Sequence, residues 1–174
     1  FNVTISDGQG GSVDQLVTTT ITGTNDGPTI NATGTNGTGS VTEDASNPTL
    51  NTTGSISFND IDLIDVHSTS VTPSASNTLG GTLTMGSISE SPTTESGSVA
   101  WSYQVNNSAV QYLAAGQTTT ESFNVTISDG QGGSVDQLVT TTITGTNDGP
   151  TINATGTNGT GSVTEDASNP TLNT

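Results

Sequence analysis

Three aspartates within six residues, Asp60, Asp62 and Asp65, are the side chains of this chain best suited to chemistry. They follow an alternating apolar and polar run, Gly54–Phe58, which predicts a strand that ends just before them. Carboxylates this close repel one another unless a cation lies between them, and Ca²⁺ takes six to eight oxygen ligands of this kind. The spacing therefore predicts a calcium site; the alternative is that these acids, Asp65 in particular, are solvated side chains of a polar loop. Mg²⁺ suits the pattern less well because it requires octahedral geometry, and Zn²⁺ because the chain has one His and no Cys.

A second set of oxygens lies in the hexapeptide Gly23–Pro28, which returns unchanged as Gly145–Pro150. Each copy follows the same β-rich run, Gln15–Thr22 in the first copy. Turn-forming residues beside a proline predict that the strand ends there. Asn25 and Asp26 also offer side-chain oxygens at this point. We interpret the hexapeptide as a joint between two β-modules and as part of a calcium site.

The charge of the chain excludes several classes of partner. It has no Lys or Arg against 16 Asp and Glu, a formal net charge of −16. Nucleic acid and anionic membrane surfaces are excluded because they are bound through Lys and Arg, and cations must come from outside the chain. Such a polar, acidic composition is also typical of disordered linkers, but the apolar residues are β-branched or aromatic and alternate with polar ones, which favours strands.

The sequence repeats itself. Residues 1–52 return unchanged as residues 123–174, a period of 122 residues, and a fixed period is typical of an array of structural units. The period fits one immunoglobulin-sized sandwich of about 100 residues. We expect residues 1–27 to be the C-terminal part of one repeat, 28–149 a complete repeat and 150–174 the N-terminal part of the next.

The complete repeat contains about seven candidate strands separated by turn signals, which predicts an all-β fold of antiparallel β-sandwich modules. In the run Ser98–Val105 a period of two puts Val99, Trp101, Tyr103 and Val105 on one face. Trp101 is therefore expected in the core, with a role as a sugar or cofactor platform as the alternative. The only helix-like patch is Ala109–Ala115.

The stretch Asp7–Pro28 (DGQGGSVDQLVTTTITGTNDGP), repeated from Asp129, resembles the C-terminal signature of VCBS-type, cadherin-like repeats of large bacterial surface adhesins of the RTX class. Leu113–Gly116 followed by Glu121–Asp129 resembles the same repeats. The resemblance implies tandem immunoglobulin-like or cadherin-like sandwiches joined by calcium-binding linkers. It also implies two ligand sets: Asn25, Asp26, Asp60, Asp62 and Asp129, with Asp65 possible, at the first joint, and Glu43, Glu121, Asn147 and Asp148 at the second.

Catalysis is not expected. His67 is the only imidazole and no Lys is present to act as a base, and no Gly-x-Ser-x-Gly sequence occurs. We interpret His67 as a strand residue beside an acidic loop, and Asp14, Asp136, Glu90 and Glu95 as surface charges.

The leading hypothesis is an extender repeat of an extracellular adhesin or filament on a bacterial cell surface, stiffened by Ca²⁺ at its joints. Its partners would be identical neighbouring repeats, or like chains in a filament or biofilm, without direct membrane contact. The alternative is an adhesive module that binds a glycan, ice or a partner cell.

Overall fold

The structure, a computed structural model, describes residues 1–46 and 48–164. In this part of the chain the strands are β1 (Asn2–Ser6), β2 (Ser12–Leu16), β3 (Thr29–Ile30), β4 (Thr38–Thr42), β5 (Thr49–Asn59), β6 (Ser68–Pro73), β7 (Thr82–Ser91), β8 (Thr94–Asn106), β9 (Thr118–Ser128) and β10 (Ser134–Thr144). One 3-10 turn, η1 (Asn107–Ala109), lies between β8 and β9.

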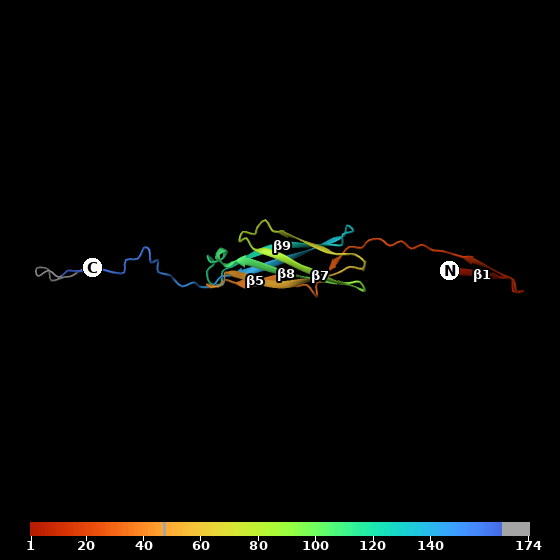
Figure 1. Cartoon of the computed structure of the whole chain (residues 1–174), viewed down its shortest axis with the longest axis horizontal. Coiled ribbons are helices and arrows are strands. Elements are labelled where there is room, and N and C mark those ends of the chain that lie inside the picture. Colours follow the sequence, from red (N-terminus) through yellow and green to blue (C-terminus); the bar gives the residue numbers. More distant parts are fainter. Residues whose placement is uncertain (47, 165–174) are drawn as a thin grey trace.

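Strands β3 to β10 form two four-stranded sheets, in the order β4-β10-β9-β6 and β3-β5-β8-β7 (Figure 1). Neighbouring strands are antiparallel except β4, which runs parallel to β10. The chain crosses from one sheet to the other between β3 and β4, where the side chains of Asn31 and Asn36 accept hydrogen bonds from the amides of Thr33 and Thr38, each at 3.2 Å. The predicted all-β, largely antiparallel sandwich is confirmed.

The core lies between the two sheets, where every second residue is buried along much of β8, β9 and β10. Val99, Trp101, Tyr103 and Val105 are each no more than 2% exposed, as their period of two predicts. The Trp101 indole donates to the Asn36 carbonyl at 2.8 Å, so its polar atom is satisfied inside. Trp101 is therefore a core residue, and the platform alternative is wrong.

Two local predictions differ from the structure. The patch Ala109–Ala115 is not an α-helix: one 3-10 turn ends at Ala109, and non-helical chain leads to β9. Val110 and Leu113, which follow the turn, are both buried and anchor this loop to the core. The sandwich has eight strands where about seven were expected, with β3 and β4 in different sheets.

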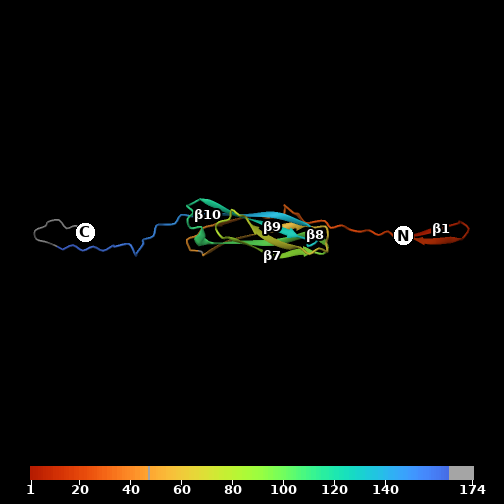
Figure 2. The same ribbon diagram turned by 90° about the horizontal axis from the view of Figure 1, so that it is seen from above.

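Residues on either side of the sandwich extend away from it. Figures 1 and 2 show the β1–β2 hairpin beyond one end and residues 150–164 beyond the other. The hairpin repeats the sequence and register of the paired β9 and β10, but Ile5 is 63% exposed where the equivalent Ile127 is 0% exposed. Its pairing is local, and its apolar side chains lack the second sheet that would cover them.

The segment after β10 contains no strand within residues 150–164. It does repeat a local hydrogen bond: the Thr155 amide donates to the Asn153 side chain at 3.1 Å, as Thr33 does to Asn31. Residues 165–174 of the expected next repeat lie outside the described part of the chain. The repeat boundaries 1–27, 28–149 and 150–174 stay a prediction, and all eight sandwich strands fall within the middle one.

Candidate metal centre

Four strand ends meet at the end of the sandwich that the chain enters, here called the incoming end. Thr29 of β3 pairs with Asn59 at the end of β5, and Ser68 of β6 pairs with Ser128 at the end of β9. The residues that follow β5 and β9, and those that precede β3 and β6, are therefore brought to the same edge. This register positions the acidic loop 60–67, Asp129 and the linker that ends at Pro28.

The loop after β5 brings its three predicted carboxylates together. One oxygen from each of Asp60, Asp62 and Asp65 lies within 4.8 Å of the others. The bend is fixed by two backbone amides, since Asp62 N–H donates to Asp60 Oδ1 at 2.9 Å and Asp65 N–H donates to the Asp62 carbonyl at 3.0 Å. At Ca–O distances of about 2.3–2.6 Å, two ligands on opposite sides of the ion lie about 4.6–5.2 Å apart. The three oxygens are therefore close enough together to share one metal ion.

Asp65 is the least satisfied member of this cluster. Its Oδ2 is buried and has no hydrogen-bond partner. Burial raises the pKa of the Asp65 carboxyl above its ordinary value, and the nearby charges of Asp62, Asp60 and Asp129 raise it further. An unpartnered carboxylate oxygen facing like charges is what a cation would relieve.

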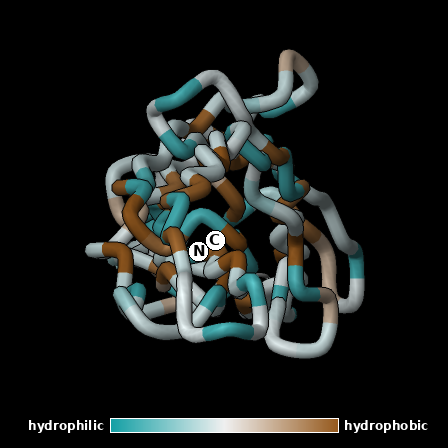
Figure 3. Tube along the Cα trace, turned by 90° about the vertical axis from the view of Figure 1, so that its right-hand side faces the viewer, coloured by the Kyte–Doolittle hydropathy of each residue, from teal (hydrophilic) through white to brown (hydrophobic). Residues whose placement is uncertain are grey.

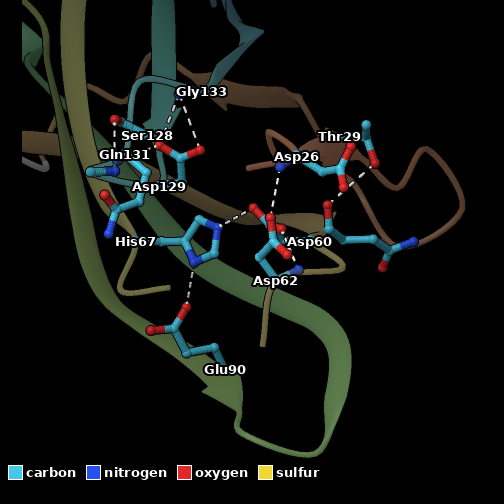
Figure 4. Close-up of polar contacts among 12 residues, drawn as sticks. Asp26, Thr29, Asp60, Asp62, His67, Glu90, Ser128, Asp129, Gln131 and Gly133 are labelled. Atoms are coloured by element: carbon cyan, nitrogen blue, oxygen red, sulfur yellow. Dashed lines mark hydrogen bonds and ion pairs between the residues drawn. The ribbon is translucent and has the colours of Figure 1, made fainter. Parts of the chain in front are cut away.

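The linker contacts the acidic loop directly, although Asn25 and Asp26 are themselves exposed. The Asp26 amide donates to Asp62 Oδ2 at 2.7 Å (Figure 4), and the Asn25 side-chain amide donates to Asp129 Oδ2 at 2.9 Å. The backbones also meet closely, because a Cβ added at Gly133 would lie 2.6 Å from the Gly27 Cα. The glycine at 133 is needed for this approach.

Asp129 lies beside the cluster and anchors its own turn. Its carboxylate accepts the amides of Gln131 at 2.7 Å and Gly133 at 2.9 Å. The hydrogen bond from Asn25 is the largest influence that holds the pKa of Asp129 below its ordinary value, and the turn amides lower it further. Asp7, the equivalent residue of the N-terminal hairpin, makes the same two turn bonds without a linker beside it. The turn is therefore local, whereas the Asn25 contact depends on the sandwich.

His67 and Glu90 also belong to this site. The sequence placed His67 beside the acidic loop but gave no sign that Glu90 would reach it. The imidazole lies between two carboxylates: Nε2 is 3.1 Å from Asp60 Oδ2 and Nδ1 is 2.7 Å from Glu90 Oε2 (Figure 4). The ring packs against Phe58, with 4.7 Å between ring centroids. His67 thus orients Asp60 from outside the three-carboxylate cluster, and Glu90 is more than a surface charge. No local pattern signals this contact, because Glu90 is brought there by the pairing of β7 with β8.

At the opposite, outgoing end, Glu43 holds the start of the next linker. Its Oε2 accepts the Thr146 amide at 2.9 Å and the Thr146 hydroxyl at 2.6 Å, and its Oε1 accepts the side-chain amide of Gln111. The Thr146 hydroxyl is the main cause that lowers the pKa of Glu43. Asn147 and Asp148 follow and are exposed. The structure thus brings Glu43 to the residue before Asn147, but does not bring Asn147 or Asp148 into a carboxylate cluster within the described residues.

Glu121 has a different environment. Its carboxylate is 1% exposed and accepts hydrogen bonds from the Leu79 amide at 2.8 Å, the Gly81 amide at 3.0 Å and the Tyr103 hydroxyl at 2.8 Å. Burial and the contact with Glu121 raise the pKa of Tyr103. The carboxylate therefore fixes the connection between β6 and β7, and its predicted part in a calcium site stays a prediction.

Within residues 1–46 and 48–164, the group of acidic side chains close enough to share an ion is Asp60, Asp62 and Asp65. These residues could hold a divalent cation, with Asn25, Asp26 and Asp129 beside them. No helix in this part of the chain has the length and apolar character needed to cross a membrane. No protein-family model matches the chain, and no curated protein sequence matches it.

Proposed function

We propose that the chain is a segment of a tandem array of β-sandwich extender repeats from a bacterial extracellular adhesin or surface filament, with Ca²⁺ at each joint. The proposal joins three features: the exact repetition of residues 1–52, the sandwich between the two linkers, and the resemblance to VCBS-type repeats of RTX adhesins. Figure 3, a view along the long axis, shows the N-terminus near the middle of the outline. A chain that enters near this axis suits an extended array.

The observation that carries the proposal is the unpartnered Asp65 Oδ2 beside Asp60 and Asp62, directly under the linker. A purely solvated acidic loop would expose this oxygen to water. The chain has no Lys or Arg that could neutralise the cluster. A hard divalent cation satisfies both the orphaned oxygen and the local charge.

The linker contacts support a role at a joint rather than inside one module. Asp26 and Asn25 donate to Asp62 and Asp129, so an ion at the acidic loop would also fix the linker. Thr24, which precedes Asn25, is the repeat equivalent of Thr146, and Thr146 holds Glu43 of its own module. In an array, Glu43 of the preceding module would therefore lie next to the linker residues that reach Asp62 and Asp129.

The concentration range of extracellular calcium suits such a site. Extracellular calcium modules bind with dissociation constants of about 10⁻⁴–10⁻³ M. Calcium bound only by the ordered joint stabilises the fold by mass action. The array would be stiff outside the cell and flexible wherever calcium is scarce.

The alternative of a glycan-binding module gains no support from the aromatic side chains of the sandwich. Trp101, Tyr103, Phe58 and Phe123 are each no more than 1% exposed, so they cannot stack on a sugar. Tyr112 is the exposed aromatic residue of the sandwich, and it lies in the loop between η1 and β9. A lone aromatic does not make a binding platform.

Calorimetric titration of the 174-residue chain with calcium tests the proposal. We expect binding with a dissociation constant of about 10⁻⁴–10⁻³ M, weaker binding of magnesium, and at least about tenfold weaker calcium binding in Asp62→Asn, which removes one charged ligand. Asp136→Asn is the matched control, because Asp136 is an exposed strand residue outside the cluster. Absence of calcium binding, or equal weakening by both substitutions, would contradict the proposal.

A further inference from the structure

The acidic loop also presents an exposed apolar surface at the incoming end. Ile61 is 66% exposed, Ile64 93% and Val66 76%. They alternate with the aspartates, so the loop turns its carboxylates toward the linker while these side chains remain in water. Leu63, at 39%, is exposed as well. Only 27% of this chain is hydrophobic, so four exposed aliphatic side chains on one loop are a surface without a partner in the described part of the chain.

The outgoing end carries an exposed aromatic side chain. Tyr112 is 65% exposed, although Val110 and Leu113 on either side of it are 0% and 3% exposed. The two buried neighbours fix the loop, because Leu113 N–H donates to the Val110 carbonyl at 3.0 Å. Tyr112 is thus held outward on a rigid support at the end from which the chain leaves.

One glycine relates these two surfaces. Gly145 is bonded to the loop that bears Tyr112: its amide donates to the Gln117 carbonyl at 2.9 Å and its carbonyl accepts from Gly116 at 3.0 Å. A Cβ added at Gly145 would lie 2.6 Å from the Leu113 carbonyl oxygen, so the approach is close.

Gly23 is the same residue one period earlier. It lies at the incoming end, where it lines a hollow together with Asn25, Asp62 and Ile64. In an array, a single glycine would therefore be bonded to the Tyr112 loop of the module before it and would line the same hollow as Ile64 of the module after it. The two loops would then lie on either side of the short linker that follows this glycine.

We propose that consecutive modules dock through an apolar contact in which Tyr112 of one module packs on Ile64 of the next. This inference rests on the tandem array of the proposed function. It adds to each joint an apolar contact that forms without a metal ion. The occupant of the Ile64 surface is the preceding copy of the module, because the shared glycine brings that copy there and the repeat identity supplies the same pair at every joint. The contact would orient the modules, with the carboxylates fixing the linker beside it.

A cross-link tests this docking. The chain is lengthened by one period, as residues 1–149 followed by residues 28–174, and carries Tyr112→Cys in its first complete copy and Ile64→Cys in its second. The natural sequence has no cysteine, so a short bismaleimide reacts only at the introduced pair. We expect the majority of the chain to be cross-linked, and a control pair of Tyr112→Cys with Leu138→Cys in the second copy to react several-fold less. Equal yields for the two pairs would overturn the docking.

A second measurement separates contact from mere proximity. Tyr112→Ser should lower the melting temperature of the lengthened chain by about 3 °C or more, yet leave that of the 174-residue chain nearly unchanged, because there the side chain is already exposed. Equal shifts in both chains would overturn the docking. Calcium binding, measured separately on the 174-residue chain, distinguishes the two proposals. An efficient cross-link without calcium binding refutes the calcium joint alone. Calcium binding without the cross-link refutes the docking alone.

Discussion

Replacing Asp65 by asparagine should change the stability of the module in opposite directions with and without calcium. Without calcium, Asp65 faces the carboxylates of Asp60 and Asp62, and its Oδ2 has no hydrogen-bond partner. Its folded-state pKa is raised above the ordinary 3.8, so its ionisation costs stability as pH rises above that value. Asparagine has the same shape, carries no charge and can donate to its neighbours. In chelator at pH 7, Asp65→Asn should therefore melt higher than the natural chain.

With calcium the order should reverse. At 10 mM calcium, a site with a dissociation constant of about 10⁻³–10⁻⁴ M stabilises the fold by about 1.4–2.7 kcal/mol. For a module of about 120 residues, with an unfolding entropy of about 2.1 cal/mol/K per residue, this raises the melting temperature by about 5–10 °C. Asp65→Asn should lose most of that increment, because it removes one of the three converging carboxylates.

The assay is thermal unfolding followed by the fluorescence of Trp101, the single tryptophan, which is 1% exposed in the core. Asp136→Asn controls for the general effect of removing one charge from a chain of net charge −16. If Asp65→Asn melts lower than the natural chain in chelator, or gains as much from calcium, the interpretation of Asp65 as an unsatisfied calcium ligand is refuted.

Three further substitutions test the packing and the charges. Gly97→Ala should destabilise the module by about 1–3 kcal/mol, because the new Cβ would lie 2.3 Å from the buried ring of Phe58. Urea unfolding measures the effect, with Gly86→Ala as the matched control because its nearest neighbour would lie at 3.4 Å. Equal losses of stability in the two variants would contradict the close packing at Gly97. Thr141→Val should stabilise the module by about 1 kcal/mol, because the buried Thr141 Oγ1 has no hydrogen-bond partner; a loss of stability in the same assay would show that this hydroxyl is bonded. Thr126→Val removes the hydrogen bond that lowers the pKa of Asp136 below 3.8. The substitution should therefore lower the free energy of unfolding at pH 7, and this loss should shrink as pH falls from about 4 toward 2. A loss that does not change with pH would show that the Thr126 hydroxyl does not lower the pKa of Asp136.

The local parts of the fold could be predicted from the sequence because neighbouring residues determine them. Asn31 and Asn153 organise the same turn, although Asn31 lies between two strands of the sandwich and Asn153 lies outside it. Asp7 and Asp129 likewise make the same turn bonds inside and outside the sandwich. The alternation that buries Trp101 is of the same kind, since a period of two is a property of the strand itself.

The contacts between distant segments could not be predicted in this way. The parallel pairing of β4 with β10 joins Val41 to Ile143, about a hundred positions later, and no residue pattern records it. The same holds for Glu90, which reaches His67 only after β7 has paired with β8. The acids of the site could be named because their spacing is local, whereas the hydrogen bonds that engage Glu121 in the core depend on where β6, β7 and β9 meet.

Small-angle scattering of the lengthened chain, in millimolar calcium and then in chelator, tests the calcium joint most directly. The longest strand, β8, has 13 residues, and at about 3.3 Å per residue one module adds about 40 Å to a straight array. In calcium we expect the maximum dimension to exceed that of the 174-residue chain by about this amount, and in chelator we expect the distance distribution to broaden as the joint bends. Identical profiles in calcium and in chelator would refute the calcium joint.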